Sequence, residues 1–594
     1  MLELRTSSAP RRGKFQLIDE MDRSHKSAAQ ERPARTIRYI AAVLALPLIV
    51  LWQQDNILFT GVGFITPWAY YGFFRNLLEF EKTLSGNPVA ARLSWILPGA
   101  ALYKLLPPLA ANYTLHLGVH SLAAVCLFLT LKWVVGARRA FVTTLLFSIN
   151  PYLCSATGWD DVDGISIAYC LLTICLLTWA ALSNHRRWPL LAAGMSFAGV
   201  VYCNSDWLVL SFLPLYYVGL MRTWHKSTLV HSFFVLCRWF GAGCAILTIM
   251  FCLINKYLDG SFLLYGGPVL QLLHPSNGLN QPSSGLWLNQ APAPWLLCLL
   301  AALPASGMVL LQQARSTRYG LTIAALFSLQ FLGSLAWMVW GQLRGSALLG
   351  LPYHANILLP LSFLVIGARF WPELDAISFR NYRAFCVAAA IVLGYAWIPA
   401  GTNWIPNLPY PAWLGLAVIT ASLVWKQSPD NMVWALAGFF VLTAMGVSFT
   451  YGAGMDPHGF REEFQVQNRA RDRVEEVRHG QPVRFWYDKQ DRAMLDGMAL
   501  ASSYSWSNSL FSQSFAAVPC NRNLAPSTVI AIISADRSHG SEFAAAALNG
   551  CWSGKGVRAV PVETDLYHRG SIEFELSLLR LESVSPDEHP VRMN

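Results

Sequence analysis

Three carboxylates within four residues stand between two apolar runs of the sequence. Asp160, Asp161 and Asp163 lie at this boundary, and each run is long enough to enter a membrane. A helix cap explains one of them, because an Asp at a helix N-terminus is favourable by about 0.3–1 kcal/mol. Three acids repel one another unless a proton or a cation relieves the repulsion. We therefore interpret the cluster as functional, and Asp161 with Asp163 could hold a divalent cation such as Mg²⁺ or Mn²⁺.

Asp55 is a second candidate, because it directly follows the first apolar run of the chain. Residues 55–111 are too interrupted by Gly and Pro to form one membrane span and too aromatic to form a free loop. They predict a first outer loop with one or two amphipathic helices in the membrane interface. Its aromatic side chains include Trp68, Tyr70 and Tyr71. The alternative is a surface-lying connector without chemistry.

A third set lies in the stretch "GQLRGSALLGLPYHANILLP", residues 341–360. Arg344 is the only base between two expected spans there, and Tyr353 and His354 stand at the entry of the second span. A phosphate at the bilayer surface would explain this Arg, because a guanidinium binds phosphate through two parallel hydrogen bonds. The alternatives are a salt bridge to an outer acid and snorkelling of the side chain. Weaker candidates on the same side are Arg92 and Lys256.

The elements that must position these residues are membrane helices. The chain has 594 residues, of which 54% are apolar and 13% are charged, whereas soluble domains carry about 25% charged residues. Its mean hydropathy is +0.37. These properties predict a polytopic α-helical membrane protein with about 13 transmembrane helices in residues 36–452. The expected spans are 36–54, 112–134, 139–156, 163–183, 188–204, 206–222, 232–254, 294–313, 318–340, 354–370, 382–399, 411–426 and 431–452.

Basic residues predict the orientation of these spans. They gather in the N-terminal tail and in alternate connections, so the positive-inside rule places the N-terminus in the cytoplasm. The net charge of +10 reflects this topology and contact with the lipid bilayer, and it does not indicate a nucleic-acid partner. Residues 1–35 lack the features of a signal peptide and are expected to be a disordered cytoplasmic tail. The basic connections hold Arg138-Arg139, Arg186-Arg187, Arg222 with Lys226, Arg315 with Arg318, Arg380 with Arg383, and Lys426.

Residues 453–594 differ in composition from the rest. An odd number of spans places them outside the cytoplasm, where they predict a soluble α/β domain. Cys520 and Cys551 lie in this segment and could form a disulfide in an oxidising compartment, the alternative being two separate thiols. Four β-rich runs support the domain: "PVRFWYD" (482–488), "STVIAIIS" (527–534), "GVRAVPVE" (556–563) and "SIEFELSLLRLE" (571–582).

Other common signatures of chemistry are missing from the sequence. It contains no HExxH, no Walker loop and no CxxC. His116 and His120 are four residues apart on one expected helix, where such a pair is more often a packed polar contact than a metal site. No internal repeat is visible, which weakens the interpretation as a transporter built from inverted repeats.

The layout resembles that of a known superfamily. The stretches "NPYLCSATGWDDVDGISIAYCLLTICLL" (150–177) and "LPYHANILLPLSFLVIGA" (351–368) carry most of the resemblance in sequence. With the acid at the start of the first outer loop, they make the chain similar to the GT-C superfamily of membrane glycosyltransferases. Within this superfamily, the layout is similar to that of protein O-mannosyltransferases and of the bacterial lipid A aminoarabinose transferase. Many relatives follow the first acid with a second acid or an Arg-Tyr pair, whereas Asn56 follows Asp55 here.

The resemblance implies a reaction and a place. A polyprenyl phosphate, undecaprenyl phosphate in a bacterium, would donate a sugar to an extracytoplasmic lipid, glycan or protein with inversion at the anomeric carbon. Asp55 would be the general base, and Asp160, Asp161 or Asp163 would orient the acceptor or hold the cation. The chain would lie in the cytoplasmic (inner) membrane, with residues 453–594 in the periplasm.

The other candidate residues would bind substrate. Arg344, with His354 and Tyr353 beside it, would neutralise the leaving phosphate. The aromatic side chains Trp68, Tyr70 and Tyr71 would pack on the sugar or the acceptor.

Three other functions stay open at this point. A lipid-linked polysaccharide polymerase or ligase would rely on outer Arg and His residues. A secondary transporter or flippase would place its acids near the middle of the membrane. A non-catalytic membrane scaffold would tolerate replacement of the acids.

Overall fold

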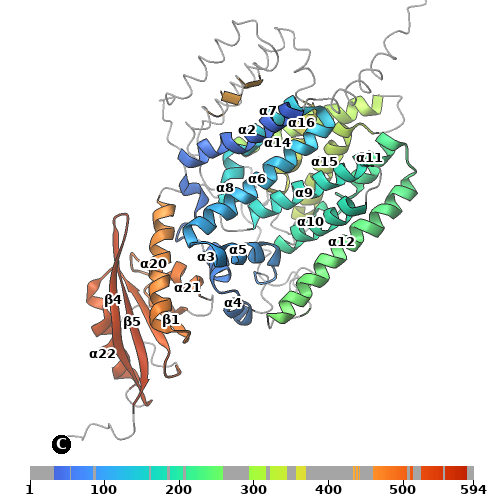
Figure 1. Cartoon of the computed structure of the whole chain (residues 1–594). Helices are drawn as coiled ribbons and strands as arrows, with labels where there is room; N and C mark the ends of the chain where they lie inside the picture. Colours follow the sequence, from blue (N-terminus) through green and yellow to red (C-terminus); the bar gives the residue numbers. More distant parts are fainter. Residues whose placement is uncertain are drawn as a thin grey trace, which may run out of the picture.

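The computed structural model consists of a helical body and a smaller sheet domain (Figure 1). The predicted tail 1–35 and the expected spans 382–399 and 411–426 lie outside the described residues, apart from the start of the first helix. The described residues are 33–53, 55–63, 65–84, 89–158, 162–183, 187–204, 209–258, 262, 293–315, 321–343, 356–369, 433–434, 437–438, 441, 459–504, 509–512, 515, 524–552 and 555–584.

The helical body follows the apolar runs of the sequence. Inside hydrocarbon every backbone polar group must bond within its own segment, so apolar runs of this length become helices. Its elements are α2 (Pro33–Gln53), η1 (Asp55–Leu58), α3 (Ile65–Arg75), α4 (Leu77–Leu84), α5 (Leu93–Leu105), α6 (Pro108–Val135), α7 (Ala137–Ser148), α8 (Pro151–Gly158), α9 (Asp163–Leu182), α10 (Arg187–Cys203), α11 (Leu215–His225), α12 (Leu229–Tyr257), α14 (Ala293–Arg315), α15 (Ile323–Leu343) and α16 (Leu359–Arg369).

Five helices of the described part are long and apolar enough to cross a membrane. They are Ala34–Trp52, Pro108–Val135, Asp163–Leu182, Leu229–Tyr257 and Ile323–Leu343. Each matches one of the expected spans. The prediction of a polytopic helical membrane body is therefore supported, whereas the number of about 13 spans stays a prediction.

Two expected spans differ from the structure. Residues 139–156 are not one helix, because the chain breaks between α7 and α8 at Asn150. The Asn150 side chain accepts a hydrogen bond from the Leu153 N–H at 3.3 Å, and Pro151 occupies the first helical position, so a new helix starts there. The expected span 206–222 is also wrong, because α11 begins only at Leu215 and has 11 residues.

The helices have two distinct ends. Asp55 and the start of α9 lie at one end, here called the loop end. The His225 ring contacts the Ala181 carbonyl at 2.8 Å, and the Thr223 hydroxyl donates to the Leu321 carbonyl at 2.8 Å. These contacts bring the last turns of α9 and α11 and the start of α15 together at the opposite end. We call it the basic end, because the connections with Arg222 and Lys226 lie there.

The first outer loop folds as helices, as the sequence predicts. After η1, the helices α3, α4 and α5 lie across the loop end of the body (Figure 1). Nearly all of α3 is buried, from Pro67 to Phe74. A helix that is apolar all round must be covered on all sides, and α3 is covered by the helical body and by the sheet domain.

The sheet domain contains five strands in the order β2-β1-β3-β5-β4. Strand β1 runs parallel to β2 and β3, and β5 runs antiparallel to β3 and forms a hairpin with β4. All four β-rich runs of the sequence form strands, whereas β2 was not predicted. The elements are α20 (Phe460–Arg478), β1 (Val483–Tyr487), α21 (Met494–Ser502), β2 (Ser509–Ser512), β3 (Val529–Ser534), α22 (Ser541–Trp552), β4 (Val557–Arg569) and β5 (Ile572–Ser583).

Alternating side chains build a core on each face of the sheet. Phe485 and Leu578 face the cluster with α20 and α21, whereas their neighbours Trp486 and Leu579 face the cluster with α22. This period of two is the sign of a sheet buried on both faces. Helix α20 is thus fixed to the sheet by one side, which leaves its other side for the helical body.

Candidate functional site

Asp55 lies where the sheet domain meets the helical body. It is the first residue of η1, and its side chain is 22% exposed. Its Oδ2 atom lies 2.6 Å from the Arg461 guanidinium of α20 and accepts a hydrogen bond from the Tyr113 hydroxyl of α6 at 2.7 Å. The neighbouring Asn56 side chain accepts from the Arg461 N–H at 3.2 Å. The carboxylate is therefore held between the two parts of the molecule.

The second acidic segment lies directly against the first. A Cβ atom on Gly158, at the end of α8, would lie 1.7 Å from the Ile57 carbonyl oxygen of η1. A Cβ atom on Gly164, at the start of α9, would lie 2.7 Å from the Ala156 carbonyl oxygen. Only glycine permits backbones to approach so closely. The end of α8 therefore lies against the segment that begins with Asp55, and the start of α9 lies against the end of α8.

The structure describes only one acid of the cluster. Asp163 is the first residue of α9 and is 4% exposed. Asp160 and Asp161 lie outside the described residues. The described residues contain no group of three or more His, Cys, Asp or Glu side chains arranged to hold a metal ion. The cation proposed at Asp161 and Asp163 thus stays a prediction.

Buried hydrogen bonds fix the two acidic segments to α6. The Asn112 amide donates to the Leu58 carbonyl at 2.7 Å and accepts from the Tyr103 hydroxyl at 3.2 Å. The His116 ring contacts the Thr157 carbonyl at 2.6 Å and the Asn112 side chain at 3.2 Å. His116 is therefore a packed polar contact, as the sequence predicts, and it joins α6 to the end of α8.

The aromatic candidates Trp68 and Tyr71 pack against the sheet domain. Both side chains are buried, and the Trp68 ring stacks on Phe464 of α20 with centroids 6.1 Å apart. The Tyr71 hydroxyl hydrogen bonds to Asn468 of α20 and accepts from Arg75 at 2.8 Å. In this structure these two rings therefore support the interface between α3 and α20, and their predicted contact with a sugar stays untested.

Tyr70, Arg92 and Lys256 lie at the loop end as well. Arg92 precedes the first residue of α5, donates a hydrogen bond to the buried Tyr70 hydroxyl and holds its guanidinium 5.8 Å from the centre of that ring. Lys256 is exposed in the last turn of α12. The end of α12 packs beside the start of α5 through the cluster of Leu93 and Phe251. Two bases predicted to bind substrate, Arg92 and Lys256, thus occur on adjoining elements.

Helix α20 holds the first outer loop at a second place, far from Asp55. The buried guanidinium of Arg478 lies 2.8 and 3.0 Å from the two carboxylate oxygens of Glu79 on α4. Between the two ends, Arg75 pairs with Asp472 at 2.7 Å. Arg461 and Arg478 are 17 residues apart, which corresponds to about 26 Å along a helix. Helix α20 is therefore docked against the first outer loop from Asp55 to Glu79.

A series of ion pairs and a hydrogen bond connects the sheet domain to the first outer loop. Arg569, at the tip of the β4–β5 hairpin, pairs with Asp496 at 2.9 Å and with Glu463 at 3.1 Å. Glu463 in turn accepts a hydrogen bond from the Val62 N–H at 2.9 Å. Burial raises the pKa of both Glu463 and Asp496, and the Arg569 charge opposes that rise. The positive charge of Arg569 therefore compensates the negative charges of the buried Glu463 and Asp496.

Glu81 is a buried acid that the sequence did not single out. It lies on α4 with no exposed surface, and neither carboxylate oxygen has a hydrogen-bond partner among the described residues. Burial raises the pKa of Glu81 to about 8. One signal could have indicated the burial of Glu81. It lies on the inner side of an amphipathic helix, between the buried Phe80 and Leu84.

The remaining candidates cannot be placed. Arg344, Tyr353 and His354 lie between α15 and α16, outside the described residues. Cys551 is disulfide-bonded, whereas Cys520 lies outside the described residues, so their pairing stays a prediction.

Of the comparisons with known proteins, the one with solved structures bears on the fold. No family model and no curated protein matches the sequence. The crystal structure of ArnT from Cupriavidus metallidurans bound to undecaprenyl phosphate matches with a TM-score of 0.51 and 11% identity, over 92% of this chain and 98% of that one. The same protein in the apo state matches with a TM-score of 0.49 and 12% identity. ArnT is a lipid A aminoarabinose transferase of the GT-C superfamily, so the resemblance predicted from the sequence is confirmed at the level of the fold.

Proposed function

We propose that the protein is a GT-C-type membrane glycosyltransferase that moves a sugar from undecaprenyl phosphate to an extracytoplasmic acceptor. One observation carries this proposal: the segment of Asp55 adjoins the end of α8, which packs against the start of α9 with Asp163, at the loop end of an ArnT-like body. A transferase acting on a lipid-linked sugar needs its acids at the membrane surface, where the head of the donor lies while the tail stays in hydrocarbon.

Asp55 serves as the general base in this proposal. Among the described residues, both of its contacts fall on Oδ2, from Tyr113 and Arg461, so Oδ1 is the atom that takes the proton. The acceptor hydroxyl loses its proton to Oδ1 as its oxygen attacks the anomeric carbon, and the bond to the donor phosphate breaks. Two fixed partners on one oxygen also hold the carboxylate in a single orientation.

The remaining roles are assigned by chemistry and position. Asp163 and its neighbours Asp160 and Asp161 orient the acceptor beside Asp55. Basic side chains at the loop end, Arg92 and Lys256 among those described, attract the donor phosphate and stabilise it as it leaves. Arg344 and His354 have the same proposed role.

A divalent cation would fit the carboxylate ligands that the acidic cluster offers. Carboxylate oxygens are the ligands that Mg²⁺ and Mn²⁺ prefer, and Asp163 with Asp161 would provide two of them. Such a cation would supply positive charge next to the donor phosphate. The buried position of Asp163 at the start of α9 agrees with a charged group that is compensated locally.

The proposed topology follows the two ends of the body. Since Arg222 and Lys226 lie at the basic end, that end faces the cytoplasm under the positive-inside rule. The loop end and the sheet domain then face the periplasm of a bacterial inner membrane, with the N-terminus in the cytoplasm. The partners are the lipid bilayer, the lipid-linked donor and an acceptor of unknown identity.

The rival functions make different use of the same residues. A transporter needs acids near the middle of the membrane, whereas Asp55 and Asp163 each stand at the end of a helix. A lipid-linked polymerase or ligase remains the second candidate, since it would use the same membrane donor and the outer bases.

Transfer of radiolabelled sugar tests the proposal. Membranes that contain the full chain are supplied with sugar-loaded undecaprenyl phosphates, and incorporation is compared among wild type, Asp55→Asn, Asp161→Asn and Asp163→Asn. Loss of a general base typically costs a factor of about 10²–10⁴. The control is Glu476→Gln, an exposed carboxylate on α20 that pairs with Arg473. Unchanged incorporation in Asp55→Asn and Asp161→Asn would overturn the catalytic assignment.

A further inference from the structure

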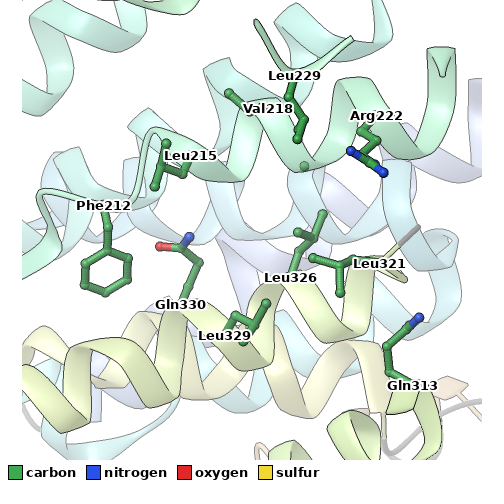
Figure 2. A pocket seen from close by; sticks show the side chains of 11 residues that line it. Phe212, Leu215, Val218, Arg222, Leu229, Gln313, Leu321, Leu326, Leu329 and Gln330 are labelled. Atoms are coloured by element: carbon green, nitrogen blue, oxygen red, sulfur yellow. The ribbon is translucent and has the colours of Figure 1, made fainter. Parts of the chain in front are cut away.

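A pocket opens between α11, α12, α14 and α15 at the basic end of the helices (Figure 2). Its volume is about 630 Å³. Asp163 starts α9 at the loop end, whereas the pocket is lined by α11, α12, α14, α15 and the residues beside them, and by none of α9. The Tyr216 hydroxyl, next to the pocket residue Leu215, lies 3.2 Å from the Thr178 hydroxyl, which is about 22 Å along α9 from Asp163. The pocket is therefore separate from the candidate catalytic site.

The walls of the pocket are hydrocarbon and open to the surrounding bilayer. Leu215, Leu229, Leu321 and Leu329 line it, and their side chains are between 36% and 49% exposed. A Cβ atom on Gly219 would lie 2.4 Å from the Leu326 side chain, so α11 and α15 touch at that point. A lipid acyl chain fits such walls, because leucine side chains exposed on a membrane helix face hydrocarbon.

Polar groups enter the same pocket from opposite walls. Arg222 is exposed in the last turn of α11 and forms no ion pair in the described part of the chain. Gln330 of α15 is only 7% exposed, and its side-chain oxygen has no hydrogen-bond partner among the residues that the structure describes. Figure 2 shows the Arg222 guanidinium and the Gln330 amide directed into one gap. An occupant of pure hydrocarbon would leave both groups uncompensated.

The two polar groups differ in depth. Arg222 lies in the turn region where the helices leave the membrane, whereas Gln330 is seven residues into α15, about 10 Å along its axis. An exposed base above apolar walls with one buried amide matches a molecule with an anionic head, a polar linkage and a long chain. Lys226, which ends α11, adds positive charge at the same level.

We infer that this pocket binds one anionic phospholipid of the leaflet at the basic end. Its phosphate contacts Arg222, its ester region lies next to Gln330, and one acyl chain fills the leucine-lined wall. Basic pockets between membrane helices are suited to anionic head groups, and a guanidinium offers two parallel donors to a phosphate. The inference does not depend on the proposed sugar transfer.

Native mass spectrometry of the full chain in detergent tests this inference. The delipidated protein is titrated with dioleoylphosphatidylglycerol, with zwitterionic dioleoylphosphatidylcholine and with inorganic phosphate. We expect the anionic lipid to bind at least about tenfold more tightly than the zwitterionic lipid, because the head group is held by a charge-assisted contact. Inorganic phosphate at millimolar concentration should not displace it, since the acyl chain contributes to binding.

Three variants distinguish the pocket from general attraction of lipid. Arg222→Gln should reduce the preference for the anionic lipid at least about fivefold, and Leu329→Trp should weaken binding of the anionic lipid by filling the pocket without a change in charge. Arg315→Gln removes an exposed base at the end of α14 that does not line the pocket, and it should bind like wild type. Thermal unfolding without lipid checks that each variant is folded.

Several outcomes would overturn the inference. Equal binding of both lipids by wild type would show that charge plays no part. The same loss in Arg222→Gln and Arg315→Gln would show diffuse attraction to the basic end, and displacement by inorganic phosphate alone would show a plain anion site. Unchanged binding in a folded Leu329→Trp variant would place the lipid elsewhere.

Discussion

Asp55 and Arg461 are 406 residues apart in sequence and form an ion pair of 2.6 Å. The pair joins the first residue of η1, the element that follows the first membrane helix, to the first turn of α20. Its position means that the sheet domain reaches the proposed catalytic acid directly. The sheet domain is therefore a structural part of the site, and its arginine holds one of the two carboxylate oxygens.

Removing Arg461 should affect activity more than stability. Since the two side chains are 45% and 22% exposed, the pair contributes only about 0.2–1 kcal/mol to folding. Arg461→Gln should therefore unfold close to the wild-type temperature while its sugar transfer falls several-fold, because Asp55 loses a fixed orientation. Arg469→Gln, an exposed arginine on the same helix, is the matched control. Equal activity of both variants would argue against an orienting role.

Glu79 should be more important for stability than the exposed acids of α20. Arg478 is buried to 5% exposure and is held by both Glu79 oxygens, so Glu79→Gln leaves a buried guanidinium with weaker partners. We expect a loss of about 1.5–3 kcal/mol in the free energy of unfolding in detergent. Glu476→Gln, at 63% exposure, should change it by less than about 0.5 kcal/mol. Similar values for the two variants would contradict the docking role of Arg478.

Gly158 should not tolerate a side chain. In Gly158→Ala the new methyl group would meet the Ile57 carbonyl oxygen at 1.7 Å, so η1 and α8 must separate. We expect a large loss of sugar transfer and a lower unfolding temperature. Gly118→Ala on α6 meets nothing within 4 Å and should be neutral or stabilising by up to about 1 kcal/mol. Wild-type transfer in Gly158→Ala would show that the contact of the two segments is not needed.

Glu81 should make stability depend on pH. Burial raises its pKa to about 8 from the ordinary value of 4.5, so the folded protein keeps a proton that the unfolded chain releases between these values. This contribution is fully present below pH 4.5 and is lost as the pH rises towards 8. Thermal unfolding from pH 5 to 8.5 should show the fall in wild type and a flatter profile in Glu81→Gln. Parallel profiles for the two proteins would show that Glu81 ionises normally.

The disulfide of Cys551 should close a loop of the sheet domain. If its partner is Cys520, then Cys551→Ser and Cys520→Ser should each destabilise the domain by about 2–4 kcal/mol, because the open loop restores freedom to the unfolded chain. Peptide mapping without reduction identifies the pair. A different partner in the map would refute the predicted pairing.

The sequence predicted the parts of the structure that follow from local patterns. Long apolar runs became α2, α6, α9, α12 and α15, because backbone groups in lipid have no other way to form hydrogen bonds. The four β-rich runs became the strands β1, β3, β4 and β5 of the sheet domain. The break at Asn150 was overlooked, although Asn-Pro is a signal for a helix start.

The long-range parts of the site could not be predicted in this way. The contact of Arg461 with Asp55 has no periodicity and no fixed spacing, and Arg461 alone looks like an ordinary surface charge. The contacts of Trp68 and Tyr71 with α20 could not be predicted for the same reason, and their predicted contact with a substrate stays a prediction. Glu81 was hidden because its neighbours Glu79 and Lys82 suggest a charged, solvated helix.

The two anchors of α20 restrict how the site can open. Helix α20 forms one ion pair through Arg461 and another through Arg478. It cannot rotate about one of these pairs while the other remains intact. The first loop and the sheet domain must therefore travel as one rigid unit. A motion of α20 that exposes Asp55 must therefore break both ion pairs together. Otherwise α20 stays in place, and the acceptor enters along its side.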